Sequence, residues 1–296
     1  MHTQIALKIY ALKKMNVIKS NAFFWNNFSR IESIENMQID TKKYEQEINQ
    51  KKLNLVWIFD ENFPKIQTQL SKSERPYFFA YKGDLNLLNQ LHKNIAVIGS
   101  RRINQDIEER EKQIVQLLCE QDFNIVSGLA KGCDTIAHQI SLEQNKKTIA
   151  TLPCEIPDIY PPENINLANA IAQNGGLLIS EYVTTPKTHL ERKARFIERD
   201  RLQALFSNAV ILIASQMRKN NGSKYAMQKA IKYHRQTFAM YNNQTDANQE
   251  MFEMNKVFIN KGTKILNISS LKEIKNQIMF PIQFTMPFMF DNSFDR

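Results

Sequence analysis

Short apolar runs alternate with stretches of helical periodicity through the middle of this chain. The runs at 95–98 and 209–214 are almost entirely aliphatic, as is typical of strands buried on both faces of a sheet. Strands that alternate with helices predict right-handed βαβ units, and therefore a mostly parallel α/β sheet with helices on both faces. The predicted strands are 95–98, 123–126, 148–152, 177–180, 209–214 and 236–240, and the predicted helices lie near 105–120, 134–143, 164–173, 197–206 and 223–234.

The regions on either side of this alternation have different patterns. Apolar residues at helical spacing predict a helix over 4–18, and two apolar runs, 53–59 and 77–81, predict further strands. The polar stretch 242–253 predicts an exposed loop. We therefore expect three parts, which are a small helical N-terminal region at 1–52, an α/β domain at 53–268, and a C-terminal helix with a Phe/Met-rich tail at 269–296.

The chain is basic, with a net charge of +9 and a pI near 9.3 over 296 residues. A basic surface attracts nucleic acid or anionic membrane, although a lysine-rich composition alone gives the same balance. The three cysteines form no C-x-x-C pair, which argues against a disulfide framework or a zinc site. Because no apolar run approaches about 18 residues and no signal peptide is present, we expect a cytoplasmic protein without a membrane partner.

Two glycine turns follow predicted strands and open predicted helices. The first contains Gly99, Ser100 and Arg101, and the second contains Gly128 and Lys131. Ligands of parallel sheets bind beyond the carboxyl ends of the strands, where helix N-termini favour anions. A third flexible segment follows the strand at 209–214 and contains Lys219, Gly222 and Ser223. Together these turns predict a phosphate site.

The segment 193–201 combines cations with an aromatic ring. Lys193, Arg199 and Arg201 supply charge around Phe196, a combination that is typical of proteins that bind single-stranded nucleic acid. Structural roles are the alternatives. Arg101 could pair with a carboxylate such as Glu181, Phe196 could anchor its helix in the core, and the lysines could be ordinary loop residues.

Other polar residues near the turns favour structural roles. Asp134 is expected to cap the helix that follows it, and His138 is expected to be packed and hydrogen-bonded. The chain contains no G-x-x-x-x-G-K-[ST], G-x-S-x-G or H-E-x-x-H motif. We therefore predict no catalytic residue, no cofactor and no metal, and a binding protein rather than an enzyme.

In their order and spacing these segments resemble the DNA-processing protein A (DprA, also called Smf) family. The resemblance covers roughly 53–266 and implies a Rossmann-like core, single-stranded DNA as ligand, a RecA-type recombinase as partner, and a homodimer. One departure lies in the family's F-P-x-R-N-R stretch, because Asp200 stands here where the family has asparagine. The matching segments are 99–101, 127–134 with 137–138, 160–164, 179–182, 196–201 and 221–223.

The combined prediction is a protein that binds single-stranded DNA, protects incoming strands and helps to load a recombinase. Two alternatives remain open. One is a Rossmann-like enzyme that binds or processes a nucleotide, and the other is a regulator of the antitoxin or phage-defence type. The predicted DNA-binding residues are Gly99, Ser100, Arg101, Gly128, Lys131, Lys193, Phe196, Arg199, Arg201, Lys219, Gly222 and Ser223.

Overall fold

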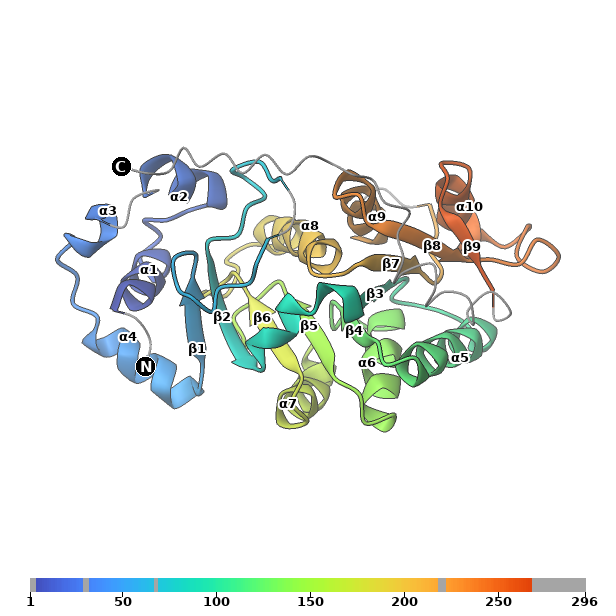
Figure 1. Cartoon of the computed structure of the whole chain (residues 1–296), viewed down its shortest axis with the longest axis horizontal. Helices are drawn as coiled ribbons and strands as arrows, with labels where there is room; N and C mark the ends of the chain where they lie inside the picture. Colours follow the sequence, from blue (N-terminus) through green and yellow to red (C-terminus); the bar gives the residue numbers. More distant parts are fainter. Residues whose placement is uncertain (1–3, 29–31, 67–68, 218–221, 268–296) are drawn as a thin grey trace.

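One mixed sheet runs through the computed structural model, which describes residues 4–28, 32–66, 69–217 and 222–267. Its strands within these ranges are β1 (Asn54–Trp57), β2 (Phe78–Gly83), β3 (Asn94–Ile98), β4 (Asn124–Ser127), β5 (Thr148–Leu152), β6 (Leu177–Ser180), β7 (Ala209–Leu212), β8 (Gln236–Met240) and β9 (Lys264–Leu266). The strand order is β1-β2-β6-β5-β4-β3-β7-β8-β9 (Figure 1). Strand β2 is antiparallel to both of its neighbours, and all other pairs are parallel. The predicted α/β fold is confirmed.

Helices cover both faces of the sheet (Figure 1). One face carries α5 (Gln105–Glu120), α6 (Cys133–Glu143) and α7 (Ile165–Gln173), and the other carries α8 (His189–Leu205), α9 (Gly222–Lys232) and α10 (Glu253–Ile259). Successive strand residues point to opposite faces, so Ile95 and Val97 pack with α5 and α6 while Ala96 and Ile98 pack with α8 and α9. Short 3-10 turns are η1 (Leu85–Asn89), η2 (Leu91–Lys93), η3 (Pro162–Asn164) and η4 (Glu250–Phe252).

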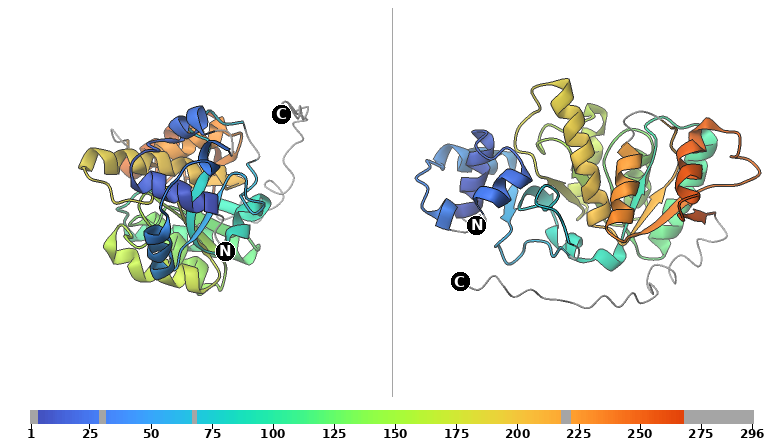
Figure 2. Two further views of the ribbon diagram at one scale, coloured as in Figure 1. Left: turned by 90° about the vertical axis from the view of Figure 1, so that its left-hand side faces the viewer. Right: turned by 90° about the horizontal axis from the view of Figure 1, so that it is seen from above.

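Helix α8 is longer than the sequence pattern predicts, because it begins at His189 instead of near 197. Its 17 residues span about 25 Å, whereas strands of four or five residues span about 15 Å. The extra turns stand beyond the carboxyl ends of the strands (Figure 2, right). The segment therefore carries its polar side chains to the edge where a ligand of a parallel sheet binds.

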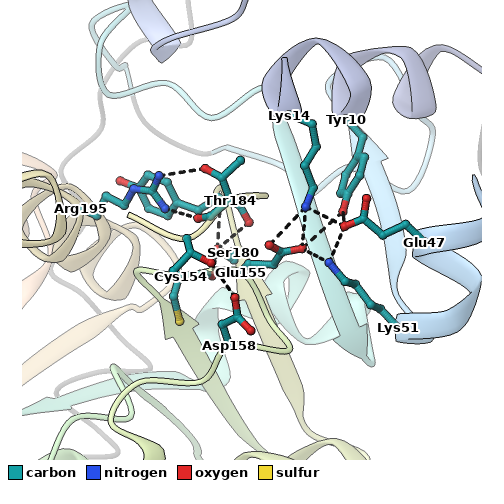
Figure 3. A network of polar contacts seen from close by, with 12 residues as sticks. Tyr10, Lys14, Glu47, Lys51, Cys154, Glu155, Asp158, Ser180, Thr184 and Arg195 are labelled. Atoms are coloured by element: carbon teal, nitrogen blue, oxygen red, sulfur yellow. Dashed lines mark hydrogen bonds and ion pairs between the residues drawn. The ribbon is translucent and has the colours of Figure 1, made fainter. Parts of the chain in front are cut away.

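The N-terminal helices pack beside β1 at one end of the sheet (Figure 1). They are α1 (Gln4–Lys14), α2 (Asn21–Asn27), α3 (Glu32–Glu35) and α4 (Lys42–Lys51), and they share one apolar cluster with β1, β5 and α7. Glu155, in the loop after β5, accepts hydrogen bonds from Lys14 of α1 and Lys51 of α4 (Figure 3). This buried carboxylate ties the helical region to the sheet.

Two local predictions differ from the structure. The segment 242–253 is less open than expected, because Asp246 is fully buried and forms a two-point ion pair with Arg110 at 2.8 and 2.9 Å. The helix predicted over 4–18 ends at Lys14, and Met15 is exposed. The domain boundaries proposed from the sequence stay predictions, and the expected helix and tail at 269–296 lie outside the described residues.

Candidate nucleic-acid interface

A pocket of about 600 Å³ opens at the carboxyl edge of β3, β4 and β7. Its walls come from the segments after β3, β4 and β7, from α8 between His189 and Gln203, and from the first two turns of α9. Strand order explains this convergence, because β4, β3 and β7 are neighbours and parallel, so the loops after them meet. The turns for which the sequence predicts a phosphate site therefore border a hollow that is large enough for part of a nucleotide.

The two predicted glycine turns pack directly against each other. A Cβ on Gly99 would lie 2.3 Å from the Cys133 Sγ, and a Cβ on Gly132 would lie 2.4 Å from the Ser100 carbonyl oxygen. Gly132 also has a φ of +71°, which favours glycine. The backbone N–H of Cys133 donates to the Ser100 carbonyl at 3.1 Å. The glycines are therefore needed for close packing of the turns that carry Arg101.

The second glycine turn does not present its groups to the pocket as the sequence suggests. Gly128 is buried, and its carbonyl accepts a hydrogen bond from Arg199. The N–H of Ala130 donates to the Asp134 carboxylate at 3.2 Å, so Asp134 stabilises this turn rather than capping α6. Lys131 is exposed and pairs with Glu163. The prediction that Gly128 contacts phosphate does not fit its buried position.

A basic and aromatic rim surrounds the mouth of the pocket. The exposed guanidinium of Arg101 lies over the Phe196 ring, with its Cζ 4.8 Å from the ring centroid. The Tyr160 ring meets Phe196 edge to face at 5.7 Å, and the Arg192 guanidinium lies 5.4 Å from the Tyr160 centroid. Lys193 is half-buried and lines the same hollow. We call Arg101, Tyr160, Arg192, Lys193 and Phe196 the rim.

Arg201 occupies the interior, contrary to the sequence prediction. The residue is 4% exposed, and its guanidinium binds both carboxylate oxygens of Glu181 and donates to the backbone carbonyls of Glu74 and Glu198. The carboxylate partner that the sequence allowed for Arg101 thus belongs to Arg201. With its donors taken by the protein, Arg201 has no route to a DNA phosphate.

Arg199 is also held inside the protein, where it forms the base of the pocket. It is 2% exposed, and its Nη1 donates to the carbonyls of Gly128 and of Thr151, the latter at 2.6 Å. Its Nε lies 3.1 Å from Oδ1 of Asp200. Arg199 therefore links α8 to β5 and to the turn after β4. A direct contact between its guanidinium and a phosphate does not fit this geometry.

Two carboxylates lie at the floor of the pocket. Asp134 and Asp200 are both buried, and both line the hollow. Burial raises the pKa of Asp200 to about 6, although Arg199 acts against the shift. Burial likewise raises the pKa of Asp134. The pocket thus has a cationic rim, and at its floor two carboxylates, which we call the acidic floor, lie beside the Arg199 guanidinium.

The third predicted segment reaches the pocket through its described residues. Ser223 is buried, and its hydroxyl donates to the Gly99 carbonyl at 3.0 Å. Gly222 is exposed, and a Cβ there would lie 2.7 Å from Oδ2 of Asp200. Ser223 therefore joins the first turn to α9, while Gly222 borders the acidic floor. Lys219 lies outside the described residues.

Sequence reasoning missed three residues of this site, which are Tyr160, Arg192 and Asp200. Arg192 and Phe196 are four residues apart, so a helix that begins before 192 places them on one face.

His138, in contrast, behaves as expected. It is fully buried, its Nδ1 lies 2.7 Å from the Thr148 hydroxyl, and burial lowers its pKa to about 3.

Between residues 4 and 267, outside the three undescribed gaps, no group of three or more His, Cys, Asp or Glu side chains is arranged to hold a metal ion. Within the same ranges, no helix is long and apolar enough to cross a membrane.

Comparison with known proteins identifies the family. The DNA recombination-mediator protein A family matches residues 54–278. Protein Smf of Borreliella burgdorferi is 28% identical over 202 residues, which cover 67% of this chain and 62% of that protein. DNA processing protein DprA of Streptococcus pneumoniae is 33% identical over 183 residues, which cover 62% of this chain and 61% of that protein. The matched part thus spans just over three fifths of each relative.

Solved structures agree with this comparison. The crystal structure of DprA from Streptococcus pneumoniae superposes with a TM-score of 0.67 at 26% identity, covering 90% of this chain and 95% of that one. A DprA structure from Helicobacter pylori, described for its single-stranded DNA binding mode, gives a TM-score of 0.60 at 26% identity, covering 77% and 96%. The sheet and its carboxyl-edge pocket define a Rossmann-like α/β protein. The chain belongs to the DNA recombination-mediator protein A family, as the resemblance implies.

Proposed function

We propose that this chain binds single-stranded DNA across the carboxyl edge of its sheet, in the service of DNA processing and recombination. The observation that carries the proposal is the pair formed by the exposed Arg101 guanidinium and the Phe196 ring at the mouth of the pocket. Cations follow the phosphates of a strand, and aromatic or guanidinium planes stack its bases. Family membership and the DNA-binding relative from Helicobacter pylori support the same ligand.

The rim favours an unpaired strand over a duplex. In a duplex the faces of the bases are stacked and unavailable, whereas a single strand offers them to Phe196, Tyr160 or Arg101. Arg101 covers one face of the Phe196 ring. When its guanidinium turns to a phosphate, that face is freed for a base. Arg101, Lys193 and Phe196, with Ser100 and Arg192 beside them, form the contact set of this proposal.

The experiment is a fluorescence anisotropy titration of the full chain with a labelled oligothymidylate. The proposal expects saturable binding that unlabelled single strands displace and that a duplex of equal length displaces poorly. Preference for the duplex, or no binding at low salt, would overturn it.

Family membership also supports two partners and a location. We propose a homodimer, a RecA-type recombinase as the protein that receives the strand, and a site of action in the cytoplasm. Light scattering at several concentrations tests the first, and co-precipitation of a RecA-type protein with the DNA-loaded chain tests the second.

A nucleotide-processing enzyme is the second candidate, and the carboxylates Asp134 and Asp200 in the pocket favour it. We place it behind DNA binding because both carboxylates already serve protein groups. Asp134 accepts from the Ala130 N–H, and Asp200 accepts from Gln203 and lies beside Arg199. The function proposed first is therefore non-enzymatic. Incubation with a panel of nucleotides separates the two, because turnover that Asp200→Asn abolishes would favour the enzyme.

A further inference from the structure

The acidic floor of the pocket has a consequence for the strand held at its rim. Asp200 lies on α8, one turn below Phe196, with 5% of its surface exposed. Its Oδ1 accepts from Nε2 of Gln203 at 3.1 Å and lies 3.1 Å from Nε of Arg199. Its Oδ2 faces Gly222 at the start of α9. The carboxylate is therefore fixed in place beneath the phosphate site.

The charges around Asp200 come from α8, from the start of α6 and from the turn after β3. Arg199 lies beside it on α8, Asp134 faces it from the start of α6, and Arg101 acts on it from the turn after β3. Farther out, the pocket is lined by Arg102 and by His189, Arg192 and Lys193 of α8. The first turn of α9 contributes Gly222 and Ser223, which carry no charge.

A phosphate bound at the rim makes the surroundings of the Asp200 carboxylate more negative. It brings negative charge toward two buried carboxylates, and it draws the Arg101 guanidinium away from Asp200. Both effects favour the protonated form of a carboxyl group. Because the pKa of Asp200 is already about 6 without DNA, the added charge moves its titration toward neutral pH.

We propose that Asp200 sets the affinity of this site, and that binding of a DNA strand is coupled to uptake of a proton by its carboxylate. The inference rests on the proposed function and deepens it. Mildly acid conditions strengthen binding because a neutral Asp200 no longer repels the phosphate. Asp200→Asn keeps the size and shape of the side chain and cannot titrate.

The test compares two proteins that differ only at residue 200. Both carry His189→Gln, because His189 is an exposed residue that also lines the pocket, and its removal leaves residue 200 as the difference under test. Anisotropy titrations with a labelled oligothymidylate are run from pH 5 to pH 8 at constant ionic strength. The proposal expects Asp200→Asn to bind on the order of tenfold more tightly at pH 8, with an advantage that shrinks toward pH 5.

Each outcome decides the question. An affinity ratio that does not change with pH, or weaker binding by Asp200→Asn at pH 8, overturns the inference. If neither protein binds the strand at any pH, the proposed function fails and this inference fails with it. Calorimetry of the Asp200 protein in two buffers of different ionisation enthalpy gives a second measurement, in which a binding heat independent of buffer also overturns it.

Discussion

Arg201 and Glu181 form a two-point ion pair in the interior of the protein, with N–O distances of 2.6 and 2.7 Å. The two side chains are only 5% and 8% exposed. Asn21 of α2 donates to the same carboxylate at 3.1 Å, so the pair lies where the N-terminal helices meet α8. Sequence alone assigns Arg201 to DNA. In the structure, its ion pair with Glu181 and its hydrogen bond to the Glu74 carbonyl hold α8 against the rest of the fold.

Replacement of Arg201 by methionine is therefore expected to lower the free energy of unfolding, and any loss of DNA affinity follows from that loss of stability. The substitution leaves Glu181 buried without a full counter-charge, which costs about 3–5 kcal/mol of unfolding free energy. Urea unfolding measures this loss, and Arg102→Met on the exposed turn is the matched control with little expected effect. A stable Arg201→Met protein that had lost DNA binding would restore the original assignment.

Glu111 of α5 is another buried ionisable group with a measurable consequence. It is fully buried beside the Cys133 thiol, and neither carboxylate oxygen has a partner in good hydrogen-bond geometry among the residues that the structure describes. Burial raises its pKa well above 4.5. The folded protein thus keeps a proton that the unfolded chain releases above about pH 4.5. The protonated Glu111 carboxyl therefore makes its full contribution to the free energy of unfolding below about pH 4.5. That contribution is lost as the pH rises toward the pKa that Glu111 has in the folded protein.

Glu111→Leu is expected to raise the melting temperature at neutral pH. Removal of an unpartnered polar group gains about 1–3 kcal/mol, and each kcal/mol corresponds to about 2–4 °C in a domain of this size. Thermal unfolding at pH 5 and pH 8 checks the sign, because the advantage of the variant should grow with pH. A variant that melted below the parent protein at pH 8 would show that the carboxylate stabilises the fold.

The strands and most helices were predictable because their residues are buried in a regular pattern. Strands β3 to β8 follow the aliphatic runs closely, since a strand covered on both faces must be apolar throughout. The early start of α8 was missed, because its first turns stand beyond the sheet and need no apolar face. Thr188 caps α8 by accepting from the Glu191 N–H, and this Thr-x-x-Glu spacing was the available signal.

The position of the pocket was predictable from the sequence, but the direction of its side chains was not. A basic side chain on a helix normally faces solvent. Arg199 and Arg201 instead point inward, to backbone carbonyls and a carboxylate from distant parts of the chain. Those partners become neighbours only through the strand order. Arg101 and Lys193 lie at the pocket and near solvent, because a short turn carries the first and the projecting half of α8 carries the second.

The aromatic rim should contribute to binding independently of charge. Phe196→Ala removes a ring on which a base stacks, and it is expected to weaken binding of a short oligothymidylate by about 1–3 kcal/mol. Phe59, an exposed ring beside β1 at the far end of the sheet, is the matched control, and Phe59→Ala should leave the affinity unchanged. Equal losses in both variants would contradict a specific role for Phe196.

The most direct test of the account is the salt dependence of strand binding in Arg101→Ala. Each phosphate contact contributes about −0.7 to the slope of log affinity against log salt for a single strand. Lys261 is an exposed cation before β9, at the opposite edge of the sheet, so Lys261→Ala removes the same net charge away from the pocket. The account predicts a slope shallower by about 0.7 in Arg101→Ala and an unchanged slope in Lys261→Ala. Identical slopes in both variants and the parent protein would contradict it.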